Sequence, residues 1–125
     1  MATSSRGTTL FEMMITLVMV AILATVGYPS FSSYLRLSRR VQAQTDLLRL
    51  QLRQEEYHLK HGVYAPSLSE LTSLTNPHYD YRLQGGAHDY RITATARASG
   101  SQQEDRGCTT MELDRQRHQQ PADCW

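Results

Sequence analysis

The chain divides sharply into an apolar N-terminal segment and a polar remainder. Residues 13–35 carry no charged side chain, whereas residues 36–125 are densely polar. A helix that crosses roughly 30 Å of hydrocarbon needs about 20 residues, and the apolar segment reaches that length. The apolar core of a cleavable secretory signal is shorter, roughly 7–15 residues. The pattern therefore predicts a membrane-spanning helix followed by a domain outside the bilayer.

Residues 30–60 change to the pattern of an amphipathic helix. Apolar residues recur there at spacings of four and seven, which predicts a helix face that packs on a sheet. Basic residues outnumber acidic ones along this helix, which is usual for a solvated face and leaves DNA contact as an alternative. Gly62 is expected to end the helix. The residues of the predicted packing face are Tyr34, Leu37, Val41, Leu47, Leu48, Leu52 and Leu59.

The rest of the chain predicts a short helix within residues 66–74 and then a small antiparallel sheet. Apolar and polar residues alternate in two segments that are separated by Gly85 and Gly86, an arrangement typical of a hairpin. A sheet this small needs support, so it is expected to pack against the amphipathic helix and give an α+β fold. The three predicted strands are 78–83, 90–96 and 108–113.

Composition and charge do not identify a partner. The 125 residues are enough for one domain, and the formal net charge is +1. A net charge this close to zero does not indicate nucleic acid or an acidic substrate as a partner. The sequence contains no phosphate-binding loop and no nucleophile elbow. His58 and His61 share a spacing of three but have no evident further ligand, so we predict no enzyme, metal or cofactor. The two cysteines, Cys108 and Cys124, are expected to form a disulfide if this domain lies in an oxidising compartment.

A processing motif precedes the apolar segment. Residues 6–12 read RGTTLFE and run directly into it, and residues 28–31 read YPSF. Together they resemble the signal of type IV prepilins, in which the peptidase cuts after a Gly and a Glu follows five residues beyond the cut. The resemblance implies that prepilin peptidase cuts between Gly7 and Thr8 and removes residues 1–7. It also implies N-methylation of Thr8, which stands where the family usually has Phe.

Two parts of the apolar helix have predicted roles. Glu12 lies one turn into the segment, where an ionised carboxylate is costly unless it is paired. The resemblance implies that it docks on the α-amino group of a neighbouring subunit. Pro29 lacks a backbone amide and Gly27 lies nearby, so we expect this turn to be weakened by about 3 kcal/mol and to bend. The bend is either an ordinary membrane-helix kink or the segment whose melting lets such filaments extend.

The C-terminal region narrows the resemblance. Residues 107–113 read GCTTMEL and residues 122–125 read ADCW, a pattern that resembles the end of PilE-type minor pilins. The implied fold is that of type IV pilins, with a long N-terminal helix packed on a small antiparallel sheet and a C-terminal loop bounded by the disulfide. The implied divisions are a leader at 1–7, a transmembrane and filament-core helix at 8–35, and a periplasmic globular domain at 36–125.

The resemblance implies a minor pilin that is held in the inner membrane by one helix and then built into an extracellular filament. Its partners would be prepilin peptidase, the major pilin, other minor pilins and the inner-membrane assembly platform. Such a subunit would initiate or join the filament and support pilus assembly, twitching motility and attachment. Two alternatives remain open. One is a pseudopilin of a type II secretion system, which more often lacks the disulfide loop, and the other is a minor pilin that binds DNA for uptake.

Overall fold

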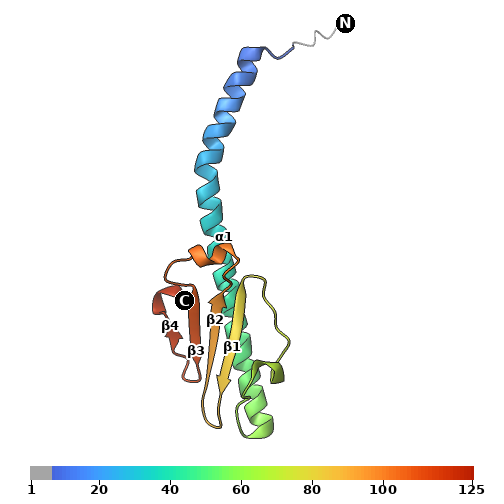
Figure 1. Cartoon of the computed structure of the whole chain (residues 1–125), viewed down its shortest axis with the longest axis vertical. Helices are drawn as coiled ribbons and strands as arrows, with labels where there is room; N and C mark the ends of the chain where they lie inside the picture. Colours follow the sequence, from blue (N-terminus) through green and yellow to red (C-terminus); the bar gives the residue numbers. More distant parts are fainter. Residues whose placement is uncertain (1–6) are drawn as a thin grey trace. The chain divides into compact units, whose positions relative to one another are not determined.

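A single long helix, α1 (Leu10–His61), forms the N-terminal part of the protein. The computed structural model describes residues 7–125, and the chain divides into two compact units, residues up to Leu35 and Arg36–Trp125. The elements after α1 are η1 (Leu68–Glu70), β1 (Tyr79–Gly85), β2 (Tyr90–Ala96), η2 (Ser101–Glu104), β3 (Thr110–Asp114), β4 (Gln119–Gln120) and η3 (Ala122–Cys124) (Figure 1).

The local sequence sets both ends of α1. At the start, Thr9 Oγ1 accepts the amide of Glu12, and the Glu12 carboxylate accepts the amide of Thr9, both at 3.3 Å. This reciprocal pair is a capping box, which satisfies two amides of the first turn. At the other end, Gly62 has φ +74° and donates its amide to the His58 carbonyl at 2.8 Å. Glycine adopts this left-handed conformation without steric cost, so the prediction that Gly62 ends the helix is confirmed.

The four strands form one antiparallel sheet in the order β1-β2-β3-β4. Leu83, Ile92 and Leu113 are cross-strand neighbours in β1, β2 and β3, and all three are buried. Ala94 and Met111 form a second buried pair. The residues between these positions are more exposed, which confirms the predicted alternation. The short strand β4 was not predicted.

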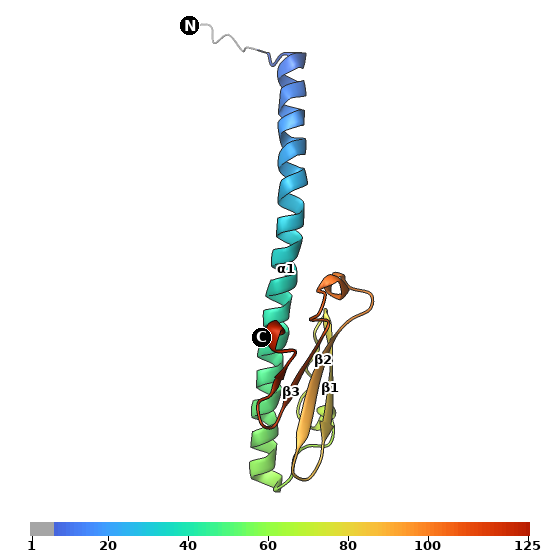
Figure 2. The same ribbon diagram turned by 90° about the vertical axis from the view of Figure 1, so that its left-hand side faces the viewer.

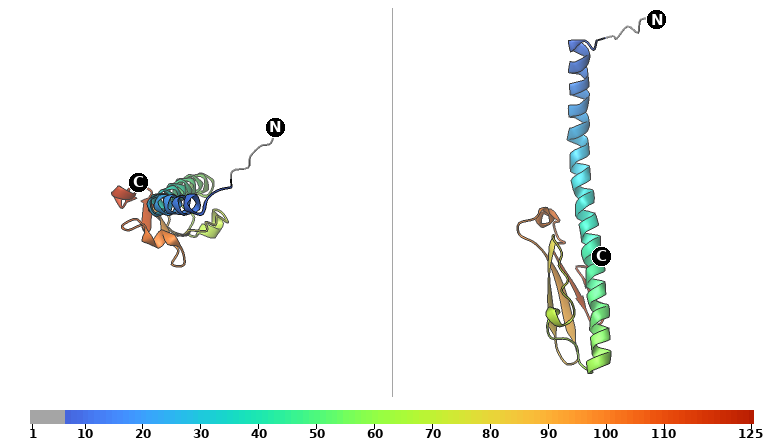
Figure 3. Two further views of the ribbon diagram at one scale, coloured as in Figure 1. Left: turned by 90° about the horizontal axis from the view of Figure 1, so that it is seen from above. Right: turned by 90° about the vertical axis from the view of Figure 1, so that its right-hand side faces the viewer.

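Helix α1 packs on the sheet with a different face from the predicted one. Within the Arg36–Trp125 unit, the sheet lies along one side of the helix (Figure 2) (Figure 3). The buried helix residues are Ala43, Asp46, Leu47, Leu50 and Gln54. Of the predicted face, only Leu47 is buried, so that prediction was wrong. The other members in this unit are 44% to 86% exposed, namely Leu37, Val41, Leu48, Leu52 and Leu59, and Tyr34 is also exposed.

The observed packing face of α1 contains two buried polar residues, Asp46 and Gln54, so the periodicity of apolar residues does not identify it. The side-chain amide of Gln54 donates to the Ala65 carbonyl at 3.0 Å and accepts the Ala65 amide at 2.8 Å. The Asp46 carboxylate accepts the Tyr81 hydroxyl at 2.7 Å and the Asn76 side-chain amide at 3.1 Å. Burial raises the pKa of Tyr81, so its hydroxyl stays a donor. Because both polar side chains have partners, the face can be buried although two of its five residues are not apolar.

Gly85 is required where β1 ends. A Cβ at this position would lie 1.9 Å from the carbonyl oxygen of Ala65, which is far inside van der Waals contact. The next residue, Gly86, donates its amide to the Asp89 carbonyl at 2.8 Å and closes the turn into β2. The predicted hairpin is therefore confirmed, and Gly85 serves the close approach of two backbone segments.

Candidate functional site

The predicted processing and docking residues lie at the start of α1. Gly7 and Thr8 precede the helix and are exposed, and Glu12 lies in its first turn. Residues 1–6 of the predicted leader lie outside the described residues. The Glu12 carboxylate takes part in the capping box with Thr9. The helix dipole also stabilises a negative charge at this end of the helix. Its docking on a neighbouring amine stays a prediction.

The apolar part of α1 is long enough and apolar enough to cross a membrane, and the window that meets this test is not buried in the protein. The helix stays α-helical through Gly27 and Pro29. Hydroxyl groups bond to backbone carbonyls on both sides of the proline, from Thr25 to Ile22 at 2.7 Å and from Ser32 to Pro29 at 3.0 Å. The bend or loosening at Pro29 stays a prediction.

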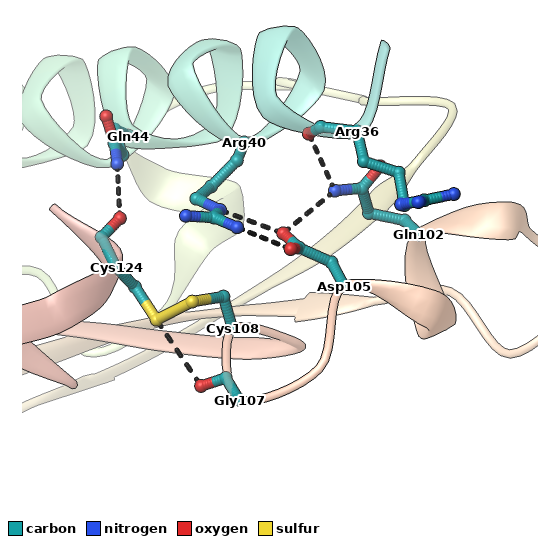
Figure 4. The surroundings of a disulfide bond; sticks show 8 residues. All are labelled: Arg36, Arg40, Gln44, Gln102, Asp105, Gly107, Cys108 and Cys124. Carbon is teal, nitrogen blue, oxygen red and sulfur yellow. Dashed lines mark hydrogen bonds and ion pairs between the residues drawn. A yellow bond between two sulfur atoms is a disulfide. The ribbon is translucent and has the colours of Figure 1, made fainter. Parts of the chain in front are cut away.

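A disulfide ties the C-terminus to the chain just before β3, which confirms the predicted pair. Cys108 and Cys124 are bonded across a sequence separation of 16. The Cys124 sulfur also contacts the Gly107 carbonyl at 3.3 Å, and the Gln44 side-chain amide on α1 donates to the Cys124 carbonyl (Figure 4). The C-terminal segment is therefore held to the sheet by a covalent bond and to the helix by a hydrogen bond.

An ion pair beside the disulfide joins α1 to the loop after β2. Two guanidinium nitrogens of Arg40 donate to the Asp105 carboxylate, and this hydrogen-bonded charge raises the pKa of Arg40 (Figure 4). The Gln102 side-chain amide donates to the Arg36 carbonyl at 3.0 Å and to the Asp105 carboxylate at 3.3 Å. The Asp105 side chain is only 9% exposed, so these contacts compensate for burying its charge. They have a structural role.

Basic side chains along α1 are largely paired with carboxylates. Glu56 pairs with both Arg53, at 3.0 Å, and Lys60, at 2.9 Å. This pairing offsets the positive charge that made the helix a candidate for DNA contact. The other pairs are Arg36 with Glu104 at 3.1 Å, Arg49 with Asp46 at 3.6 Å, and Arg40 with Asp105.

A second basic surface lies in the turn between β3 and β4, where Arg115, Arg117 and His118 are exposed. We call these three residues the basic turn. Neither arginine forms an ion pair within residues 7–125, to judge from the salt bridges found there. Asp114 closes the turn, because its carbonyl accepts the Arg117 amide at 3.0 Å and its carboxylate accepts the His118 amide at 2.9 Å. Two guanidinium groups are thus presented to solvent on a short, hydrogen-bonded turn.

Arg115 is oriented by an aromatic cluster. Its Nε donates to the Tyr64 hydroxyl at 3.0 Å, and its guanidinium carbon lies 5.9 Å from the centroid of that ring. His58 stacks on Tyr64 with 4.4 Å between ring centroids, and Tyr90 meets it edge-on at 4.8 Å. The cluster joins the end of α1, the start of β2 and the basic turn. It therefore fixes the position of Arg115 at this end of the sheet.

Sequence reasoning missed the basic turn because it treated this stretch only as part of the C-terminal loop bounded by the disulfide. The available signal was local, since two arginines and a histidine fall within four residues between the two cysteines. The β1–β2 turn, which contains His88, and the start of β2, which contains Arg91, lie at the same end of the sheet as the basic turn. Arg91 lies 3.9 Å from Glu112, at the limit of an ion pair.

Comparison with known proteins identifies the family. The family model described as "Type IV minor pilin ComP, DNA uptake sequence receptor" matches residues 29–112, about two-thirds of the chain. The chain belongs to this family of type IV minor pilins. No protein of curated function matches it significantly. In this minor pilin, the basic turn and Cys124 lie beyond the matched segment, and Glu12 lies before it.

A solved structure supports the same assignment. The minor pilin is similar to a type IV pilin from Shewanella oneidensis, with 25% sequence identity and a TM-score of 0.57 over 72% of this chain and 97% of that one. The predicted fold is therefore confirmed, with a long N-terminal helix, an antiparallel sheet and a C-terminal disulfide. Membership of the pilin family makes this protein a structural subunit that contacts other pilins in a filament.

Proposed function

We propose that this minor pilin is cut by prepilin peptidase, waits in the inner membrane with its globular domain in the periplasm, and joins a type IV pilus in which it binds DNA for uptake. The observation that carries the DNA role is the exposed basic turn, whose two arginines form no ion pair with any of the residues 7–125. Support of pilus assembly, twitching motility and attachment would follow from a place in the filament. The pilin family favours a pilus over a type II secretion pseudopilus.

The exposed face of α1 supports the proposed place in a filament. Within the globular unit it carries five large apolar side chains that the protein's own sheet does not cover, including Leu52 at 69% and Leu59 at 86% exposure. Soluble monomers rarely expose a large contiguous apolar patch, and burial of apolar area contributes about 25 cal/mol per Å². Helices of neighbouring pilins are the occupants that would cover this face.

The basic turn supports DNA rather than a protein partner. Guanidinium groups recognise phosphate through paired hydrogen bonds, and phosphate contacts supply most of the affinity in sequence-independent DNA binding. Binding residues often lie on loops that a rigid scaffold positions, as the aromatic cluster positions Arg115. The matching family is described as a DNA uptake sequence receptor, which agrees with this chemistry.

Replacing Arg117 with Gly is expected to weaken DNA binding without destabilising the fold. Arg117 has φ +64°, a left-handed conformation that glycine adopts freely, so the turn should persist while one charge is lost. The slope of log affinity against log salt should fall by about one for each lost phosphate contact. Fluorescence anisotropy with a labelled duplex, using the full chain in detergent, measures both quantities.

The matched control for this variant is Arg53→Gln, because Arg53 is exposed but paired with Glu56. We expect it to bind DNA like the wild type. If Arg53→Gln weakens binding and Arg117→Gly does not, DNA contacts the helix instead of the basic turn. Absence of duplex binding by the wild-type chain at low salt would remove the DNA role altogether.

The mature protein is expected to begin at Thr8 and to carry a methyl group on its new α-amine. Gly7 is exposed and outside the helix, so a protease can approach its backbone. Intact-mass spectrometry of protein from cells that contain prepilin peptidase checks both changes, and cells without the peptidase are the control. Protein that retains residues 1–7 in the presence of the peptidase would contradict the proposed processing.

A further inference from the structure

His118 and Asp114 form a pair at the base of the basic turn. His118 Nδ1 lies 2.8 Å from Asp114 Oδ2, while the His118 amide donates to Oδ1 at 2.9 Å. The His118 side chain is 68% exposed and that of Asp114 is 22% exposed. The imidazole can therefore exchange a proton with solvent while its partner stays in place.

The charge of this turn depends on the proton of His118. When the imidazole is neutral, the Asp114 carboxylate opposes Arg115 and Arg117, and these four groups sum to one positive charge. When the imidazole is protonated, it offsets the carboxylate, and the sum is two positive charges. Histidine is the side chain that ordinarily changes charge between pH 5 and 8.

Asp114 itself stays ionised through that range. Its partial burial acts to raise the pKa, but hydrogen bonds from the backbone amide and the ring of His118, together with the charge of that ring, hold the pKa below its usual value. Asp114 therefore does not take up a proton in mild acid. The charge change is confined to one side chain of the pair.

Other charged and titratable groups lie near the pair. In β2, Arg91 lies opposite Asp114 in the strand register and is within 3.9 Å of Glu112. From α1, the Gln51 side-chain amide donates to the Asp114 carbonyl at 3.5 Å and is neutral. The remaining groups that face this end are Arg115, Arg117, Asp89, Glu55 and two further histidines, His58 on Tyr64 and His88 in the β1–β2 turn.

We propose that protonation of His118 against Asp114 strengthens the hold of the basic turn on DNA phosphates as the pH falls, so that this minor pilin binds DNA most tightly in mild acid. The inference rests on the proposed DNA binding and adds its regulation. One additional effective charge should increase the salt dependence of binding by about one unit of slope and the affinity at low salt by several fold. Linkage fixes the direction of the pH effect. Because DNA binds the protonated form of the protein better, the protein takes up a proton when DNA binds.

The test measures binding of a labelled duplex by the full chain in detergent at pH 5.5 and pH 7.5, over a series of salt concentrations. The wild type should bind several-fold tighter at pH 5.5, with a steeper salt dependence. His118→Asn, which can donate to Asp114 but cannot gain a charge, should bind at both pH values as the wild type does at pH 7.5. His118→Lys, which is charged throughout, should bind tightly at both.

His88→Asn is the matched control, because His88 is an exposed histidine at the same end of the sheet. It should keep the pH response of the wild type. A response that survives in His118→Asn, or that disappears in His88→Asn, would overturn the assignment to His118. Binding that is equal at the two pH values in the wild type would end the inference but leave the DNA role intact, whereas no binding at either pH would end the DNA role itself.

Discussion

Replacing Glu12 with Ala is expected to leave the subunit in the membrane but to exclude it from filaments. The carboxylate lies in an apolar stretch of α1 whose side chains are exposed, so neighbouring pilins would bury it in a filament. Removing one partner of a buried ion pair costs about 3–5 kcal/mol, which corresponds to at least about a hundredfold loss of incorporation. Immunoblotting of sheared pili against total membrane protein measures the ratio.

The structure supplies a control that separates charge from helix capping. Gln at position 12 can preserve the capping box with Thr9, because Gln suits that position, but it carries no charge. If Glu12→Ala and Glu12→Gln both fail to assemble, the charge is required. If only Glu12→Ala fails, the cap is what assembly needs. Equal recovery of both variants and the wild type in sheared pili would contradict a docking role for Glu12.

The sequence predicted those features of the fold that follow from local rules. The helix ends at Gly62 because of a backbone conformation, and the strands follow from alternating residues such as Leu83 and Ile92. The packing face of α1 could not be read in this way. Gln54 and Asp46 are buried because of partners far along the chain, while Leu52 and Leu59 remain exposed. We propose that this subunit packs against other pilins in a filament. Its apolar pattern therefore reflects surfaces between subunits as well as its own core.

Charges at the candidate site could not be predicted for the same reason, because their partners are not evident from the sequence. Counting basic residues pointed to α1, but Arg53 and Lys60 share the carboxylate of Glu56, which a count does not reveal. In the described part of the chain the arginines of the basic turn form no ion pair, because its acidic residue, Asp114, is engaged by His118 and by the turn's own amides. Strand β4 escaped prediction for a related reason, since its two glutamines show no alternation and pair with β3 only after that turn reverses the chain.

Replacing Cys108 and Cys124 with Ser is expected to lower the free energy of unfolding by about 3 kcal/mol, because the covalent bond closes a loop across a separation of 16 residues. In a domain of this size, that loss corresponds to a drop in Tm of roughly 10 °C or more. Thermal melting followed by circular dichroism measures the drop. Titration of the unreduced wild-type protein should find no free thiol until it is unfolded and reduced.

Few other interactions can hold the C-terminal segment in place, which is why the effect should be large. Strand β4 has only two residues, both exposed, and a hydrogen bond from Gln44 to the Cys124 carbonyl links the segment to α1. Trp125 packs on the core with only part of its surface. Gln44→Ala, which keeps the disulfide, is the matched control and should cost about 1 kcal/mol. If the double Ser variant melts like the wild type while Gln44→Ala does not, noncovalent contacts hold the segment, and the basic turn between the two cysteines does not depend on the disulfide for its position.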